Sequence, residues 1–243
     1  MTSTTTTTTR ARYGAVGVAL APSVMLFVFL THPFIARLPD AAAVADAVEA
    51  DTTWWGIVHL LTAVGSGLVA LAFLAIRARL RDADEERFSA WALPFVIAGS
   101  ALYGLLPGLE FAPMAAARTG GDAAAAQATL QPWFISILAT SVLLFAIGIL
   151  VFARGIAASQ ILSRPLPRLV VTGLIVCATA RFVPLGMVQF YVQGLAGIVA
   201  LWPLAFQLWR QPQLTHVRTA GRSARVHDPG RAATRALSFA TVR

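Results

Sequence analysis

The sequence predicts an all-α, polytopic integral membrane protein, a bundle of six transmembrane helices with both termini in the cytoplasm. Three observations lead to this fold class: the composition, the length of the apolar runs and the placement of arginine. Of the 243 residues, 57% are hydrophobic and only 12% are charged. A soluble domain has about 25% charged residues. Because so few polar groups cannot coat a surface in water, we expect most of the surface to face lipid.

The apolar runs predict the crossings, since one helical crossing needs about 20 mostly apolar residues. These runs are longer than the ~10-residue strands of a membrane barrel and are apolar on all sides, so they predict helices. The last run, 169–209, would form a helix about twice as long as the hydrocarbon core is thick. Pro184 and Gly186 predict a turn inside it. The six predicted crossings are about 13–31, 54–76, 89–106, 132–153, 169–184 and 187–209.

The remaining segments divide the chain into a membrane domain, 13–209, and two tails. Residues 1–12 are rich in threonine and low in complexity, and we expect a disordered tail there. Residues 210–243 are polar and basic without a lasting periodicity, so we expect a mostly disordered cytoplasmic tail. A polar, acidic segment at 33–53 and a linker at 107–130 join successive crossings.

Arginine placement predicts the orientation, because cytoplasmic loops are enriched in basic residues. The segments 1–12, 77–88, 154–168 and 210–243 contain 2, 4, 3 and 7 arginines, which is 16 of the 19 basic residues. The other side has only Arg37, Arg118 and Arg181. This alternation supports six crossings independently of hydropathy, since five or seven would put basic segments on both sides. Every basic residue is arginine, as in a GC-rich genome, and we expect a bacterial plasma membrane.

Polar side chains within or beside the crossings are the candidates for function, because such groups are costly in lipid. They gather in the outer half of the predicted bundle. Gln189 and Gln193 are four residues apart, so an α-helix would place them on one face. We expect Arg181 to point toward Glu110, His59 or Gln193 and to receive an anionic or polar headgroup. The predicted ligand-binding set is Arg181, Glu110, His59, Gln193, Gln189 and His32.

Each of these residues also has a plainer explanation. The histidines and glutamines can hydrogen bond a neighbouring helix or anchor it at the membrane interface. Glu110 can belong to a solvated loop. Arg181 can extend its long side chain to lipid headgroups.

Several chemistries are disfavoured by the sequence. His32 and His59 would have to hold a haem, and this ligand pattern is so sparse that we expect no cofactor. Zinc needs three or four ligands, and we expect no metal site. Cys177 is the only cysteine, so an internal disulfide is impossible. The basic C-terminal tail favours attraction to anionic lipid over nucleic acid, so we expect the bilayer as partner and no nucleic acid.

Three functions remain open. The leading one is binding of a small or lipid-like ligand in an outer-half cavity, by a transporter-like or accessory component. The alternative is a membrane-embedded enzyme on an isoprenoid or other lipid, with Glu110 or His59 as general acid or base. The third is a structural subunit of a membrane complex. The two three-helix halves show no convincing repeat, which weakens the transporter interpretation.

Overall fold

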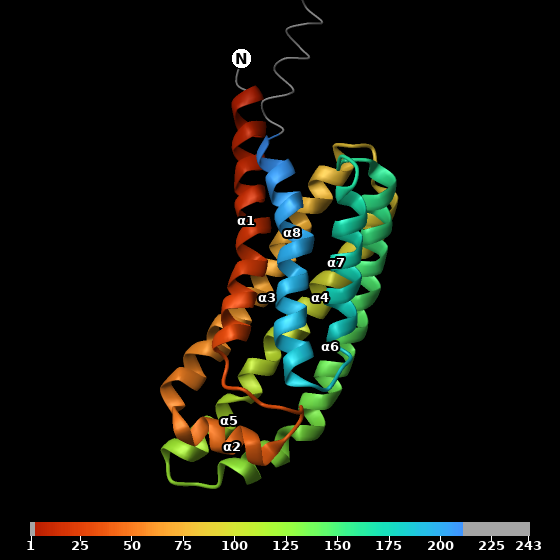
Figure 1. Ribbon diagram of the computed structural model, residues 1–243. Helices are drawn as coiled ribbons and strands as arrows, with labels where there is room; N and C mark the ends of the chain where they lie inside the picture. The colour runs from red at the N-terminus through yellow and green to blue at the C-terminus, as the bar shows by residue number, and fades with distance from the viewer. Residues whose placement is uncertain (1–2, 211–243) are drawn as a thin grey trace, which may run out of the picture.

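The computed structural model describes residues 3–210, and the regular elements in that range are all helices. Helices α1, α3, α4, α6, α7 and α8 run side by side, while α2 and α5 lie together at one end of the bundle (Figure 1). The elements are α1 (Ser3–Thr31), α2 (Ala41–Ala50), α3 (Thr52–Arg81), α4 (Arg87–Leu109), α5 (Phe111–Arg118), α6 (Ala123–Ser159), α7 (Leu166–Ala180), the π-helix η1 (Met187–Val192) and α8 (Gln193–Arg210).

Within the described range, five helical segments are long and apolar enough to cross a membrane: Thr9–Thr31, Thr52–Arg81, Arg87–Arg118, Ala123–Ser159 and Met187–Arg210. Helix α7 is also apolar but has 15 residues. At 1.5 Å per residue it is about 22 Å long, shorter than the hydrocarbon core of roughly 30 Å. The all-helical fold with several helices suited to a membrane is therefore confirmed, whereas the sixth crossing stays a prediction.

The chain is helical over more of its length than the sequence predicted. Helix α1 begins at Ser3, although we expected disorder over residues 1–12. Extending an existing helix costs much less than nucleating one, so the apolar part of α1 can carry its polar start. The linker predicted at 107–130 is instead mostly α5 and the first turns of α6. The predicted basic tail lies outside the described residues, apart from Arg210 at the end of α8.

Aspartate side chains start the helices that the sequence analysis treated as connections. Asp40 accepts a hydrogen bond from the Ala43 amide at the start of α2. Asp122 does the same for the Ala125 amide at the start of α6. Such caps satisfy amides that have no partner inside the helix, and alanine has the highest helix propensity. A polar or alanine-rich segment too hydrophilic to cross lipid can therefore still be a helix.

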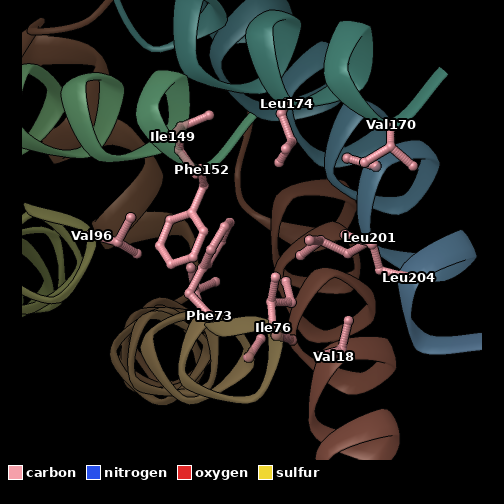
Figure 2. Close-up of a cluster of buried hydrophobic side chains, with 14 of the residues drawn as sticks. Val18, Phe73, Ile76, Val96, Ile149, Phe152, Val170, Leu174, Leu201 and Leu204 are labelled. Carbon is pink, nitrogen blue, oxygen red and sulfur yellow. The ribbon is translucent and has the colours of Figure 1, made fainter. Parts of the chain in front are cut away.

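The bundle is held by an apolar core that side chains from six helices share. Figure 2 shows Phe73 of α3 and Phe152 of α6 side by side, with Val96 of α4 facing them. The two phenylalanine rings have centroids 4.9 Å apart. Helices α1, α7 and α8 also contribute to this core, with Val18, Val170, Leu174, Leu201 and Leu204. Since lipid is as apolar as these side chains, close packing rather than removal from water holds the helices together.

Helices α4 and α6 approach most closely at two glycines. A Cβ atom at Gly99 would lie 2.7 Å from the Phe145 amide nitrogen, and one at Gly148 would lie 2.8 Å from that of Val96. Each helix therefore contributes a glycine against the backbone of the other. Ser141 adds a hydrogen bond from its hydroxyl to the Gly99 carbonyl at 2.9 Å. Small residues and a hydroxyl bond of this kind are typical of helix contacts in membranes.

The segment after α1 crosses the end of the bundle and pairs with the turn before η1. The Gly186 amide donates to the Ala36 carbonyl at 3.0 Å. A Cβ atom at Gly186 would collide with the Ile35 carbonyl, so only glycine fits there. The turns that join α3 to α4 and α6 to α7 lie at the opposite end, near the start of α1 (Figure 1). The described parts of the arginine-rich segments thus lie at one end of the bundle (Figure 1).

Candidate functional site

A cavity of about 70 Å³ lies at the end of the bundle that carries α2 and α5, and four of the six predicted site residues line it: His32, His59, Glu110 and Gln189. We call it the end cavity. Its walls are mostly apolar and include the aromatic side chains of Phe29, Trp55, Tyr103, Phe134 and Phe190. An ordered water needs roughly 10–15 Å³, so the cavity has room for several waters or for one small polar group.

The two histidines of the end cavity contact each other edge to face, with ring centroids 5.1 Å apart. His59 lies on the buried face of α3, where its Nδ1 is 2.8 Å from the Trp55 carbonyl one turn earlier. His32 follows α1, and its Nδ1 is 2.7 Å from the Pro33 carbonyl. Because a carbonyl can only accept, each Nδ1 carries the proton, and each Nε2 is left to accept a hydrogen bond. Burial lowers the pKa of His32, and the Pro33 hydrogen bond partly opposes this.

Glu110 is the buried carboxyl group of the end cavity and is only 5% exposed. It follows the last residue of α4, and its backbone carbonyl accepts a hydrogen bond from Trp55 Nε1 at 3.1 Å. Its Oε1 accepts a second bond from Gln127 Nε2, also at 3.1 Å. The other carboxyl oxygen, Oε2, is buried and has no hydrogen-bond partner. A buried acceptor without a partner is costly, so this oxygen is the strongest indication of a ligand.

Arg181 and Gln193 do not join this group but line a second cavity of about 40 Å³, which we call the core cavity. The side-chain oxygen of Gln193, with its amide oriented to satisfy both neighbours, accepts from Arg181 Nε at 3.1 Å and from Nη2 at 3.2 Å. The predicted approach of Arg181 to Gln193 is therefore present. A charge pair between Arg181 and Glu110 is absent, since the ion pair found within residues 3–210 joins Arg77 and Glu86.

The two glutamines face different cavities, although their spacing predicted a common face. Gln189 belongs to the π-helix η1 and Gln193 begins α8, so the α-helical spacing assumed from the sequence does not hold between them. Gln189 lines the end cavity and donates from Nε2 to the Arg181 carbonyl at 3.3 Å. The two side chains thus hold both the backbone and the guanidinium of Arg181.

The aromatic and amide partners of the charged groups were not predicted from the sequence. Gln127 was assigned to a linker, yet it is 4% exposed and bonds Glu110. The guanidinium carbon of Arg181 lies 3.9 Å from the Phe145 ring centre and 4.5 Å from that of Tyr103. Gln127 could have been found as a lone amide on an alanine-rich helix. The two rings could not, since an aromatic residue in an apolar run carries no distinguishing signal.

No family model, curated protein or solved structure matches this chain. The class of protein is therefore defined by its own fold and cavities. It is a helical protein suited to a membrane, with a carboxyl group and two imidazoles beside an aromatic-walled cavity and an arginine buried apart from them.

Proposed function

We propose that this protein binds a small or lipid-like ligand in the end cavity and works as a transporter-like or accessory component. The observation that carries the proposal is Glu110, whose buried Oε2 has no partner. His32, His59 and Gln189 line the same cavity, so a ligand there meets four polar side chains within aromatic walls. Few polar groups in a mostly apolar cavity are typical of small-molecule sites.

The lining groups favour a ligand that donates hydrogen bonds. Glu110 offers a carboxyl oxygen, and each neutral histidine offers its Nε2 as an acceptor. Arg181 lines the other cavity, so the end cavity has no arginine to attract the anionic headgroup that the sequence suggested. An amine, alcohol or amide fits this set, and aromatic faces also attract a cationic group. The ligand is thus a small molecule, or the polar end of a lipid, that carries such donors.

The proposal includes a placement in the membrane. We place the protein in the plasma membrane of a bacterium, with six crossings and both termini in the cytoplasm. Support comes from the 16 of 19 arginines in alternate segments and from the common end at which the described part of these segments lies (Figure 1). The end cavity then faces the outer half of the bilayer.

A membrane-embedded enzyme on an isoprenoid or other lipid is the second candidate. It is favoured by the same carboxyl group and imidazoles, because groups able to give and take a proton around one cavity can act as general acid and base. Glu110 or His59 would hold that role. Turnover distinguishes this candidate, since a binding protein returns its ligand unchanged.

Extraction of bound molecules tests the proposal. Purified protein is incubated with a total bacterial extract, split into lipid and water-soluble fractions, then washed and analysed by mass spectrometry. Wild-type protein should enrich at least one compound, and Glu110→Gln should retain it about tenfold less, since a hydrogen bond to a charged group is worth roughly 1.5–3 kcal/mol.

Glu86→Gln is the matched control, because Glu86 lies in the exposed turn before α4. It should retain the compound like the wild type. Equal retention by Glu110→Gln and wild type would place the ligand elsewhere and refute the proposal. A product of new mass that disappears with Glu110→Gln would instead establish the enzyme.

A further inference from the structure

Arg181 is a cation buried inside the bundle without an acidic partner. It follows the last residue of α7 and is 7% exposed. Its neighbours are the amide oxygen of Gln193 and the rings of Phe145 and Tyr103. In the part of the chain that the structure describes, no carboxylate lies within 4.0 Å of it.

These neighbours compensate the charge only in part. An uncompensated charge is among the most costly groups to bury, and buried charges in proteins are paired. Aromatic faces attract a cation only weakly compared with a carboxylate, and a neutral amide adds ordinary hydrogen bonds. The remaining nitrogen, Nη1, is buried and has no hydrogen-bond partner. Arg181 therefore lacks both a counter-charge and an acceptor for one nitrogen.

The core cavity lies beside this unsatisfied cation. Arg181, Gln193 and Cys177 line it, together with apolar side chains such as Phe73 and Leu174. Its volume of about 40 Å³ equals that of a few waters at roughly 10–15 Å³ each. A halide or an ion of two or three heavy atoms fits this space, whereas an acyl chain does not. The cavity thus offers room and positive charge but no anion from the protein.

We propose that the core cavity is a binding site for a small monovalent anion, such as chloride, that pairs with Arg181. The anion accepts a hydrogen bond from Nη1 and supplies the missing counter-charge inside the bundle. The end and core cavities share only Phe29 among their lining residues. The anion site therefore does not depend on the ligand proposed for the end cavity, and either can fail alone.

The first test measures the stability of the full-length protein in detergent. Sodium chloride replaces sodium gluconate at constant ionic strength, with sodium bromide and sodium formate as further arms. A ligand that binds only the folded state stabilises it in a saturable way. We expect the midpoint of thermal unfolding to rise and then level off with at least one of the small anions. Equal midpoints in all four salts, with no binding of radioactive chloride, overturn the proposal.

The second test moves the counter-charge into the protein. Gln193→Glu places a carboxylate where an amide oxygen now lies 3.1 Å from Arg181 Nε, at the cost of the bond to the Gln189 carbonyl. This variant should unfold at the same temperature with or without the anion and should bind at least tenfold less radioactive chloride. Arg118→Gln, an exposed arginine at the same end of the bundle, is the control and should keep the wild-type response.

Retention of the anion response by Gln193→Glu would place the anion elsewhere and overturn the assignment. If that variant fails to fold, Cys177→Leu decides, because it narrows the core cavity without changing a charge. It should raise the chloride concentration needed for half-maximal stabilisation about tenfold. An unchanged concentration would likewise remove the anion from this cavity.

Discussion

Gln127 donates a hydrogen bond to Glu110 across 3.1 Å and thereby ties the second turn of α6 to the end of α4. Both side chains are buried, at 4% and 5% exposure. Within the described residues, the Gln127 amide is the only hydrogen-bond donor to the Glu110 carboxyl group. The alanine-rich start of α6 therefore has a specific task, which is to hold the carboxyl group of the end cavity.

Replacing this amide should destabilise the end of the bundle. Gln127→Ala leaves Glu110 Oε1 buried without its donor, which costs about 1–3 kcal/mol. The midpoint of thermal unfolding in detergent should fall accordingly. Gln131→Ala, one turn further along α6 and half-buried, is the control and should change the midpoint little. Equal effects of the two substitutions would show that the bond to Glu110 is not important for stability.

The contact between α4 and α6 should tolerate little added volume. A methyl group at Gly99 would meet the backbone of Phe145, which cannot rotate away. Gly99→Ala should therefore lower the free energy of unfolding by about 1–3 kcal/mol, the usual cost of overpacking. Gly67→Ala, where nothing lies within 4 Å, should be neutral or stabilising. A stable Gly99→Ala variant would mean that the two helices can separate at no cost.

The sequence predicted the long helices well because hydropathy reports directly on the surrounding lipid. It placed α3 at about 54–76 and α4 at about 89–106, inside the observed Thr52–Arg81 and Arg87–Leu109. The sequence did not predict α2 and α5, because hydropathy does not detect helices that are too short or too polar to cross a membrane. The caps at Asp40 and Asp122 were visible in the sequence and would have predicted α2 and the early start of α6, whereas α5 has no side-chain cap.

The candidate site was predicted as one group and is divided in the structure. The cost of polar groups in lipid selected these six residues, and four of them line the end cavity. The cost of polar groups in lipid does not determine which helices pack against each other, so the separation of Arg181 from Glu110 could not be predicted. The π-helix η1 added a second difference, because it turns Gln189 and Gln193 toward different cavities.

Acid should destabilise the folded protein through protonation of His32 in the end cavity. Burial lowers the pKa of His32 below its ordinary 6.5, so the unfolded chain binds this proton more readily than the folded one. The contribution of the neutral His32 ring to the free energy of unfolding is fully present above pH 6.5. It is lost as the pH falls toward the lower pKa of the folded state, at a rate of at most about 1.4 kcal/mol per pH unit. Its neighbours His59 and Glu110 can titrate too, so the contribution is taken as a difference between variants.

Unfolding midpoints between pH 8 and pH 5 measure this contribution. The wild type should lose stability more steeply than His32→Phe, which keeps an aromatic ring against Trp55 and Phe190 but cannot take up a proton. The other histidines are present in both proteins, so the difference between the curves reports His32 together with its electrostatic coupling to His59. Parallel curves for the two proteins would show that His32 takes up its proton equally well when folded.

The number of membrane crossings depends on α7, the predicted crossing whose helix is short for the hydrocarbon core. Helix α7 has 15 residues, and the turn after it, which contains Leu185, lies at the end of the bundle that carries α2 and α5. The chain therefore passes from one end of the bundle to the other between residues 160 and 185. If α7 crosses, these two positions lie on opposite sides of the membrane, and the arginine count places position 160 in the cytoplasm.

Reporter fusions read this arrangement directly. Fusions at positions 85, 160 and 215 should be active with a cytoplasmic reporter, and those at 45, 120 and 185 with an external one. The reason is that the first three positions lie in arginine-rich segments and the other three lie in arginine-poor ones. Matching results at 160 and 185 would reduce the count to five crossings, because α7 would then not cross. A cytoplasmic result at position 45 would reverse the orientation and move the end cavity to the inner half of the bilayer.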